Sequence, residues 1–309
     1  MKEFRKINEA EVNTEDAKKI KDILSGGYED FVSKLKENAK DPKVIAILNL
    51  GKDDGIPTDE EIQVQDNVSY SCDTLIPTQS QIGLADSLGW LSKNNPEGAK
   101  KLIEGDTSTF NDNRILTANG KYILDGHHRW SQVYLFNPNA KIPAVNLVIP
   151  GLDEKQILKV IQMAIVATYK DLYMKDANAE TDIFSDEKMP KDVIIKKLPE
   201  IMGEKMIEVC KKAWNLDSNE KIISKITENA LKLKAKKPND APQRKFMPQP
   251  SDTAEKLAGK PEEQTKDYKG IPSDFINKIK SGELNFKAPL AKESRIIKTY
   301  EKFIQNFKK

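Results

Sequence analysis

The stretch RILTANGKYILDGHHRW, residues 114–130, gives the clearest local signal in the chain. Two short apolar runs flank Ala118-Asn119-Gly120, and an Asn-Gly pair is typical of the type I′ turn of a β-hairpin. The second run ends at Asp125-Gly126, and the residues after it have the apolar spacing of a helix. The sequence therefore predicts strand, turn, strand and helix in direct succession. Both histidines of the chain fall in the first turn of that helix.

This strand-to-helix junction combines the groups of an anion-binding site. Gly126 lets a ligand approach the backbone, and the start of a helix offers free N–H groups at its positive end. Arg129, one turn into the helix, can present two parallel donors to a phosphate. Asp125 can hold a metal ion such as Mg²⁺, orient a histidine or accept a proton. His127 and His128 are candidates for general acid or base, because their ordinary pKa lies near neutrality.

Two other interpretations of the same residues remain open. The histidines can simply begin an ordinary helix, with their rings partly buried. A zinc site is the weaker alternative, because no cysteine lies nearby and neighbouring histidines rarely bind one metal ion.

Strand-like and helix-like segments alternate through residues 56–175. Besides the hairpin, residues 61–77 and 141–149 have strand patterns, and the segments between and after them have helical patterns. This alternation predicts a small α/β or α+β domain. Residues 1–55 are expected to form a helical extension, in which VIAILNL (44–50) fits either a strand or a buried helix.

The second half of the chain changes character twice. Residues 186–235 have a helical pattern only, which Pro199 and residues 215–217 divide into about three helices. Residues 236–272 are rich in Pro, Lys and Gln, which predicts a polar linker that the body or a partner holds if it is ordered. Residues 273–309 are expected to form terminal helices. The last of these carries an apolar stripe that its own domain or a protein partner must cover.

Charge is unevenly distributed along the 309 residues. The formal net charge is only +2, yet residues 186–309 hold 28 Lys and Arg against 19 Asp and Glu. Such a basic region can contact nucleic acid or an acidic partner, or it can present solvated lysine-rich helix faces. No apolar run reaches the roughly 20 residues of a membrane helix, and the opening residues lack the apolar segment of a secretory signal. We therefore expect a cytoplasmic protein without a membrane partner, and Cys72 and Cys210 as free thiols.

Three segments together resemble the ParB/sulfiredoxin fold. DTLIPTQSQI (73–82) is similar to the first box of that family, the hairpin and junction (115–130) to its second box, and KIPAVNLVI (141–149) to its closing strand. The resemblance implies an α+β fold with a mixed sheet. It also implies that the second box binds nucleotide phosphates, with ATP or CTP and Mg²⁺ as the cofactors. The family's glycine and last arginine fall on Gly126 and Arg129.

The resemblance also implies which segment faces the junction across the cleft. Thr78, Gln79 and Ser80, directly after the first box, would line the opposite wall or cap the following helix. The sulfiredoxin thiol and the ParB magnesium-linked glutamate would both fall on His127, so neither chemistry is implied here. The box of free serine kinases is the most similar, although the glutamate that follows their first box is replaced by Gln79 and Gln81.

Three functions follow from these patterns. The first is a nucleotide-dependent phosphotransferase or NTP hydrolase, in which Asp125 and His127 or His128 carry proton or metal chemistry and Arg129 holds phosphate. The second is a bacteriophage or mobile-element structural or interaction protein that reuses the fold, located in the virion or the host cytoplasm. The third is a ParB-like protein that processes nucleic acid through its basic C-terminal region.

Overall fold

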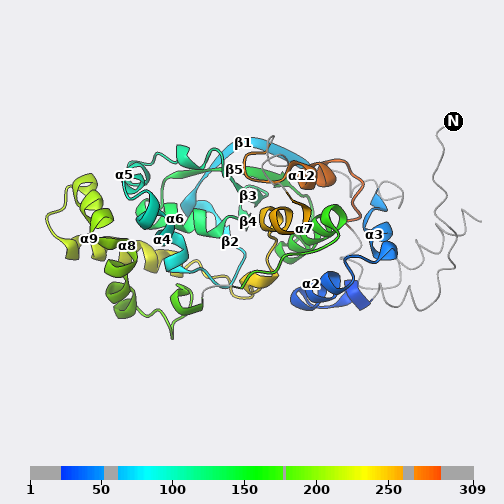
Figure 1. Cartoon of the computed structure of the whole chain (residues 1–309), viewed down its shortest axis with the longest axis horizontal. Coiled ribbons are helices and arrows are strands. Elements are labelled where there is room, and N and C mark those ends of the chain that lie inside the picture. The colour runs from blue at the N-terminus through cyan, green and yellow to red at the C-terminus, as the bar shows by residue number, and fades with distance from the viewer. Residues whose placement is uncertain (1–21, 52–61, 177–178, 260–267, 287–309) are drawn as a thin grey trace, which may run out of the picture.

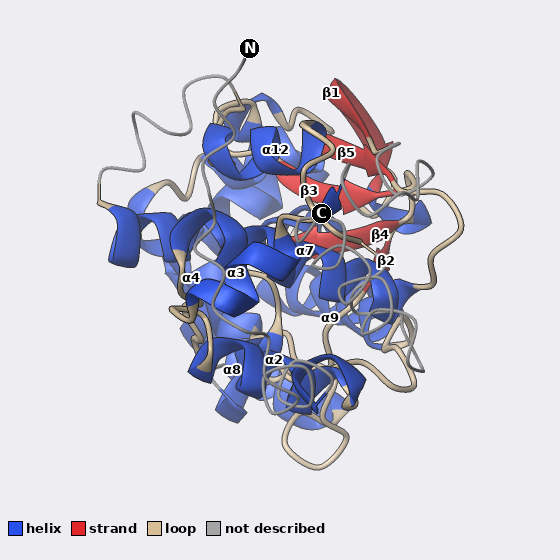
Figure 2. Ribbon diagram, turned by 90° about the vertical axis from the view of Figure 1, so that its right-hand side faces the viewer, coloured by secondary structure: helices blue, strands red, loops and turns tan. Residues whose placement is uncertain are grey.

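The computed structural model describes residues 22–51, 62–176, 179–259 and 268–286. These residues form a five-stranded mixed sheet with helices packed against both of its faces (Figure 1, Figure 2). The expected α+β fold class is thereby confirmed, whereas the domain boundaries stay a prediction. In the part of the chain that is described, no helix is both long enough and apolar enough to cross a membrane. Cys72 and Cys210 are both buried and free.

The sheet has the strand order β1-β5-β3-β4-β2. Its outer pair, β1 (Gln63–Ser71) and β5 (Lys141–Val148), is antiparallel, and β5 runs parallel to β3 (Ile115–Ala118). β3 is antiparallel to β4 (Tyr122–Asp125), which runs parallel to the two-residue strand β2 (Ile76–Pro77). The hairpin β3–β4 therefore lies inside the sheet, and β4 delivers Asp125 at the end of a central strand.

The hairpin turn has the geometry that its sequence predicts. Asn119 and Gly120 both have positive φ angles, 52° and 64°, as a type I′ turn requires. The Asn119 side chain also accepts a hydrogen bond from the Ile149 N–H at 2.8 Å, and Asn146 Oδ1 accepts one from the Gly120 N–H at 2.8 Å. These bonds tie the turn to the region around the end of β5.

Five of the described helices form a cluster on one face of the sheet, on the left in Figure 1. Trp130 of α6 is fully buried there, and its indole N–H donates to the Cys72 carbonyl at 2.9 Å. Ile115 and Ile123 of the hairpin pack into the same cluster. The helices are α4 (Leu84–Asn94), α5 (Gly98–Ile103), α6 (His127–Phe136), α8 (Lys191–Trp214) and α9 (Asn219–Lys234).

The helical region after residue 186 breaks at Gly203 rather than at Pro199. Pro199 lies inside α8, whereas Gly203 has φ 68° and ψ 158°, a conformation that glycine alone adopts readily. Asn215, in the left-handed region, then ends α8. A proline ring is compatible with helical φ and removes only one backbone hydrogen bond, so a helix can continue past it.

Elements from both ends of the described chain cover the other face of the sheet. The helices there are α2 (Tyr28–Glu37), α3 (Pro42–Leu48), α7 (Glu154–Tyr169) and α12 (Ser273–Lys280), on the right in Figure 1. The ambiguous run 44–50 is thus mainly helical. Helix α12 docks in this cluster, while the apolar stripe expected beyond residue 291 lies outside the described residues.

The body of the protein holds the described parts of the predicted linker. We call residues 236–259 the crossing segment, because it leads from the end of α9 to α7. The Tyr28 hydroxyl donates to the Phe246 carbonyl at 2.9 Å, and the amide of Gln162 donates to the same oxygen at 2.8 Å. Met247 is buried among the residues of the α7 cluster. The segment contains a 3-10 turn (Arg244–Phe246), α10 (Pro250–Thr253) and a π-helical turn (Ala254–Ala258).

Candidate functional site

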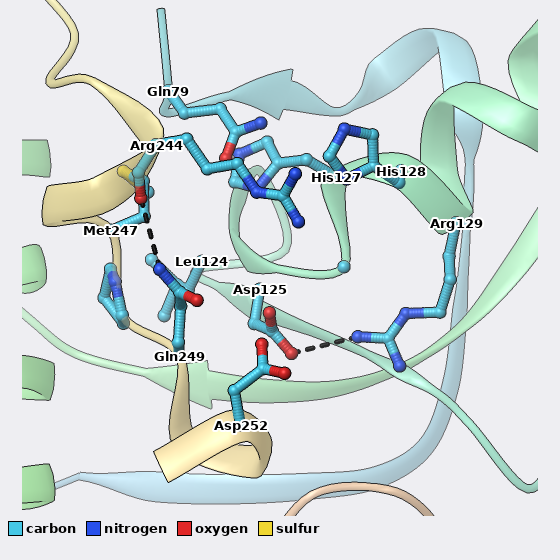
Figure 3. Close-up of a pocket in the computed structure, with 12 residues that line it drawn as sticks. Gln79, Leu124, Asp125, His127, His128, Arg129, Arg244, Met247, Gln249 and Asp252 are labelled. Atoms are coloured by element: carbon cyan, nitrogen blue, oxygen red, sulfur yellow. Dashed lines mark hydrogen bonds and ion pairs between the residues drawn. The ribbon is translucent and has the colours of Figure 1, made fainter. Parts of the chain in front are cut away.

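A partly open pocket of about 160 Å³ lies at the junction of β4 and α6 (Figure 3). Its volume is below the roughly 300–1,000 Å³ of sites that enclose a drug-sized ligand. It therefore suits a group of phosphate size, with the rest of a larger ligand outside. Three segments line it, namely Gln79 after β2, residues 124–129 at the junction, and Arg244, Met247, Pro248, Gln249 and Asp252 of the crossing segment.

Gly126 forms the junction itself, as the sequence predicts. Its φ of 93° and ψ of 23° lie in the left-handed region, and α6 begins at the next residue. A Cβ at this position would lie 2.6 Å from Ile115 Cγ2 and 2.9 Å from Arg129 Nη2. Glycine is thus required both by its backbone angles and by the close packing of the Arg129 guanidinium over it. The residues of the first turn of α6 line the pocket, and the N–H groups of a first helical turn have no partner within the helix.

Arg129 is held by partners within the protein. Its Nη2 forms an ion pair with Asp125 Oδ2 at 2.9 Å, and its Nη1 donates to the carbonyl and side-chain oxygens of Asn113. About a fifth of each charged side chain is exposed, 19% for Arg129 and 22% for Asp125. The guanidinium is therefore fixed at the pocket, and it has a structural partner besides any ligand.

Asp125 and Asp252 bring two carboxyl groups together across the pocket. Figure 3 shows the two carboxyl groups pointing toward one another. Burial raises the pKa of Asp125; Arg129 acts against this rise, and the Asp252 charge adds to it. A carboxyl with a raised pKa is better suited to accept a proton than an ordinary aspartate.

The two histidines fasten the segment between β2 and α4. His127 Nε2 accepts a hydrogen bond from the Thr78 N–H at 3.1 Å, and His128 Nε2 accepts one from the Gly83 N–H at 3.3 Å. Burial holds the pKa of His127 well below its ordinary value, and burial together with Arg244 lowers the pKa of His128 to about 3. Both rings are neutral at pH 7 and carry their proton on Nδ1.

Of the three residues expected on the opposite wall, only Gln79 lines the pocket. The Thr78 hydroxyl is fully buried and donates to the Ile123 carbonyl, while the Ser80 N–H donates to the Pro242 carbonyl at 2.9 Å. Neither hydroxyl caps α4, whose N-cap is Gly83. The Thr78 hydroxyl is thus taken up by a β4 carbonyl, and the Ser80 backbone by the crossing segment.

The crossing segment supplies pocket residues that sequence analysis did not identify. Arg244, Gln249 and Asp252 all line the pocket. Arg244 also forms an ion pair with Asp86 at 3.4 Å. The available signal was Arg244 itself, one of two arginines after residue 185 in a region where lysine supplies nearly all positive charge. Among the described residues, no group of three or more His, Cys, Asp and Glu side chains is placed to hold a metal ion.

Comparison with known proteins gives no match. No family model fits the chain, and no curated protein or solved structure is significantly similar to it. The chemistry of the pocket is therefore inferred from its own residues.

Proposed function

We propose that the pocket binds the phosphate of a nucleotide, ATP or CTP, at the first turn of α6. The observation that carries this proposal is the meeting of that turn with two arginines, Arg129 from α6 and Arg244 from the crossing segment. Helix N-termini and arginines are the groups that proteins use most for phosphate. The resemblance of the junction to the nucleotide-binding box of the ParB/sulfiredoxin fold supports the same ligand.

A Mg²⁺ ion accompanying the nucleotide would be held by carboxylate oxygens. Asp125 and Asp252 fit this role, because Mg²⁺ sites commonly use one or two carboxylates and take their remaining ligands from phosphate and water. Bound Mg²⁺ would supply neutralisation of phosphate charge.

The chemistry that these residues support is phosphotransfer to a hydroxyl or hydrolysis by water. When no cation occupies its carboxylate, Asp125 is the best-placed proton acceptor, because its pKa is raised and it lies at the pocket. His127 and His128 use Nε2 to accept backbone N–H groups, which leaves each ring a single Nδ1–H as a donor. The histidines therefore position the pocket wall, and a role as base falls to Asp125.

A structural or interaction protein is the second candidate, and one observation favours it. Arg129 and both histidines already have partners within the protein, so the junction can be explained as an internal fastening. In that case, no phosphate is needed to account for these residues, and the resemblance would extend to the fold alone.

A thermal-shift screen of the full chain with ATP, ADP, CTP and GTP, each with Mg²⁺, separates the two candidates. A ligand at about 100 times its dissociation constant should stabilise the protein by roughly 2.7 kcal/mol. A clear rise in melting temperature with ATP or CTP supports nucleotide binding. No rise with any nucleotide at millimolar concentration would favour the structural role.

A further inference from the structure

The side chain of Gln249 carries a buried oxygen without a hydrogen-bond partner in the described structure. Gln249 is 6% exposed, its Nε2 donates to the Arg244 carbonyl at 3.3 Å, and its Oε1 has no donor. Exchanging the two amide atoms would place Oε1 against the Arg244 carbonyl, so the assigned orientation is the favourable one. Buried acceptors without a donor are uncommon in folded proteins, and at a pocket they point to a missing ligand.

The unpartnered oxygen belongs to one side of the pocket. Gln249 is the N-cap of α10, and Asp252 lies three residues later in the same helix. Figure 3 shows the Gln249 oxygen directed toward the side on which Asp125 and Asp252 lie. This side therefore offers oxygen acceptors from three side chains, whereas the first turn of α6 and Arg244 offer donors. A phosphate suits the donors, and a cation suits the oxygens.

We infer that Asp125, Asp252 and Gln249 Oε1 form a site for a divalent cation of the Mg²⁺ class. Carboxylate and amide oxygens are the hard ligands that such ions prefer. The inference rests on the proposed function only for the phosphate that would complete the coordination. Two of the three ligands come from the crossing segment, so the cation would tie this segment to the end of β4.

Two positive groups already contact these carboxylates. Arg129 bonds Asp125 Oδ2, and Lys175 Nζ lies 4.0 Å from Asp252 Oδ1. Each carboxylate has a second oxygen, so a cation can bind without displacing either group. The nearby positive charges lower the affinity for a cation that binds alone, and the negative charge of a phosphate in the pocket offsets this effect. Cation and phosphate should therefore strengthen each other's binding by the same factor.

The test measures Mn²⁺ binding to the full chain by electron paramagnetic resonance. It also compares the melting temperature in Mn²⁺ with that in EDTA at matched ionic strength. We expect one Mn²⁺ per chain, and Mg²⁺ should compete for it. Gln249→Leu should weaken binding about tenfold or more. Gln249→Glu should lower the melting temperature in EDTA, because it adds a third negative charge, and should bind Mn²⁺ more tightly than the natural chain. Gln243→Glu, at an exposed position of the same segment, is the control and should leave Mn²⁺ affinity unchanged.

The outcomes for the cation and for the nucleotide can be separated. Absence of Mn²⁺ binding to the natural chain overturns the inference, as does equal affinity in the Gln249→Leu protein. If either Gln249 variant fails to fold, Asp252→Asn provides the same test and should also weaken Mn²⁺ binding. Nucleotide added in EDTA reports on the phosphate alone. Nucleotide binding without Mn²⁺ binding leaves the proposed function standing, and the reverse result leaves the cation site standing.

Discussion

Replacing Arg129 with alanine should destabilise the protein as well as weaken any phosphate binding. The change removes the ion pair with Asp125 and both hydrogen bonds to Asn113. Removing one partner of a buried ion pair costs about 3–5 kcal/mol, and one charged hydrogen bond is worth about 1.5–3 kcal/mol. Solvent reaches about a fifth of both side chains, and the Gly126 N–H still donates to the Asp125 carboxylate. We therefore expect Arg129→Ala to lower the free energy of unfolding by about 2–3 kcal/mol, less than a fully buried ion pair and within the range of one charged hydrogen bond.

This loss should be visible in thermal and in chemical unfolding. For a chain of this size, 1 kcal/mol corresponds to roughly 2 °C, so the melting temperature of Arg129→Ala should fall by about 4–6 °C. The double variant Asp125→Asn, Arg129→Ala is the matched control. It removes the charge that the single variant leaves unpaired, and it should recover at least half of the lost stability.

The effect of Arg129→Ala should also depend on pH. Burial raises the pKa of Asp125, so its ionised form is disfavoured in the folded state. Loss of Arg129 raises this pKa further. Stability of the variant therefore falls as pH increases from the ordinary aspartate value through the raised one. The stability difference from the natural chain should be larger at pH 8 than at pH 4.5. An unchanged melting temperature at pH 8, with no effect of Asp125→Asn, would refute the pairing.

Two further changes test the junction. Gly126→Ala should cost about 2–4 kcal/mol, because it forces a left-handed alanine whose Cβ lies 2.6 Å from Ile115 Cγ2; full stability in urea unfolding would contradict this. The histidines stay neutral in the folded protein but protonate near pH 6.5 when it unfolds, so stability should fall as pH drops below 6.5, through the pKa of about 3 of His128. His128→Gln keeps an acceptor for Gly83 and should remove about half of the histidine-linked loss between pH 6.5 and 5 in urea unfolding; the same pH dependence in both proteins would contradict the buried neutral ring.

Local chemistry decides the elements that the sequence predicts correctly. Asn119-Gly120 requires a hairpin turn because few other pairs accept two positive φ angles, and Gly126 marks the junction for the same reason. These features involve residues close together in the chain.

The composition of the pocket could not be predicted in the same way. The crossing segment has few apolar residues, and Arg244 meets Asp86 across 158 positions of sequence. The acceptor roles of His127 and His128 depend on backbone N–H groups of residues 78 and 83, which carry no sequence signature. A hydroxyl such as that of Thr78 is a group that can bind phosphate, yet in the structure it donates its hydrogen bond to the Ile123 carbonyl of β4.

The most direct test of the central claim is calorimetric titration of ATP and CTP, with Mg²⁺, into the full chain and into the Asp125→Asn, Arg129→Ala double variant. The natural chain should bind one of these nucleotides with one site per chain. The double variant retains much of its stability but lacks both the guanidinium and the Asp125 carboxylate. Its affinity should fall by about tenfold or more, the loss expected from one missing charged hydrogen bond alone. No heat of binding to the natural chain, or equal affinity in the two proteins, would contradict a phosphate site at the first turn of α6.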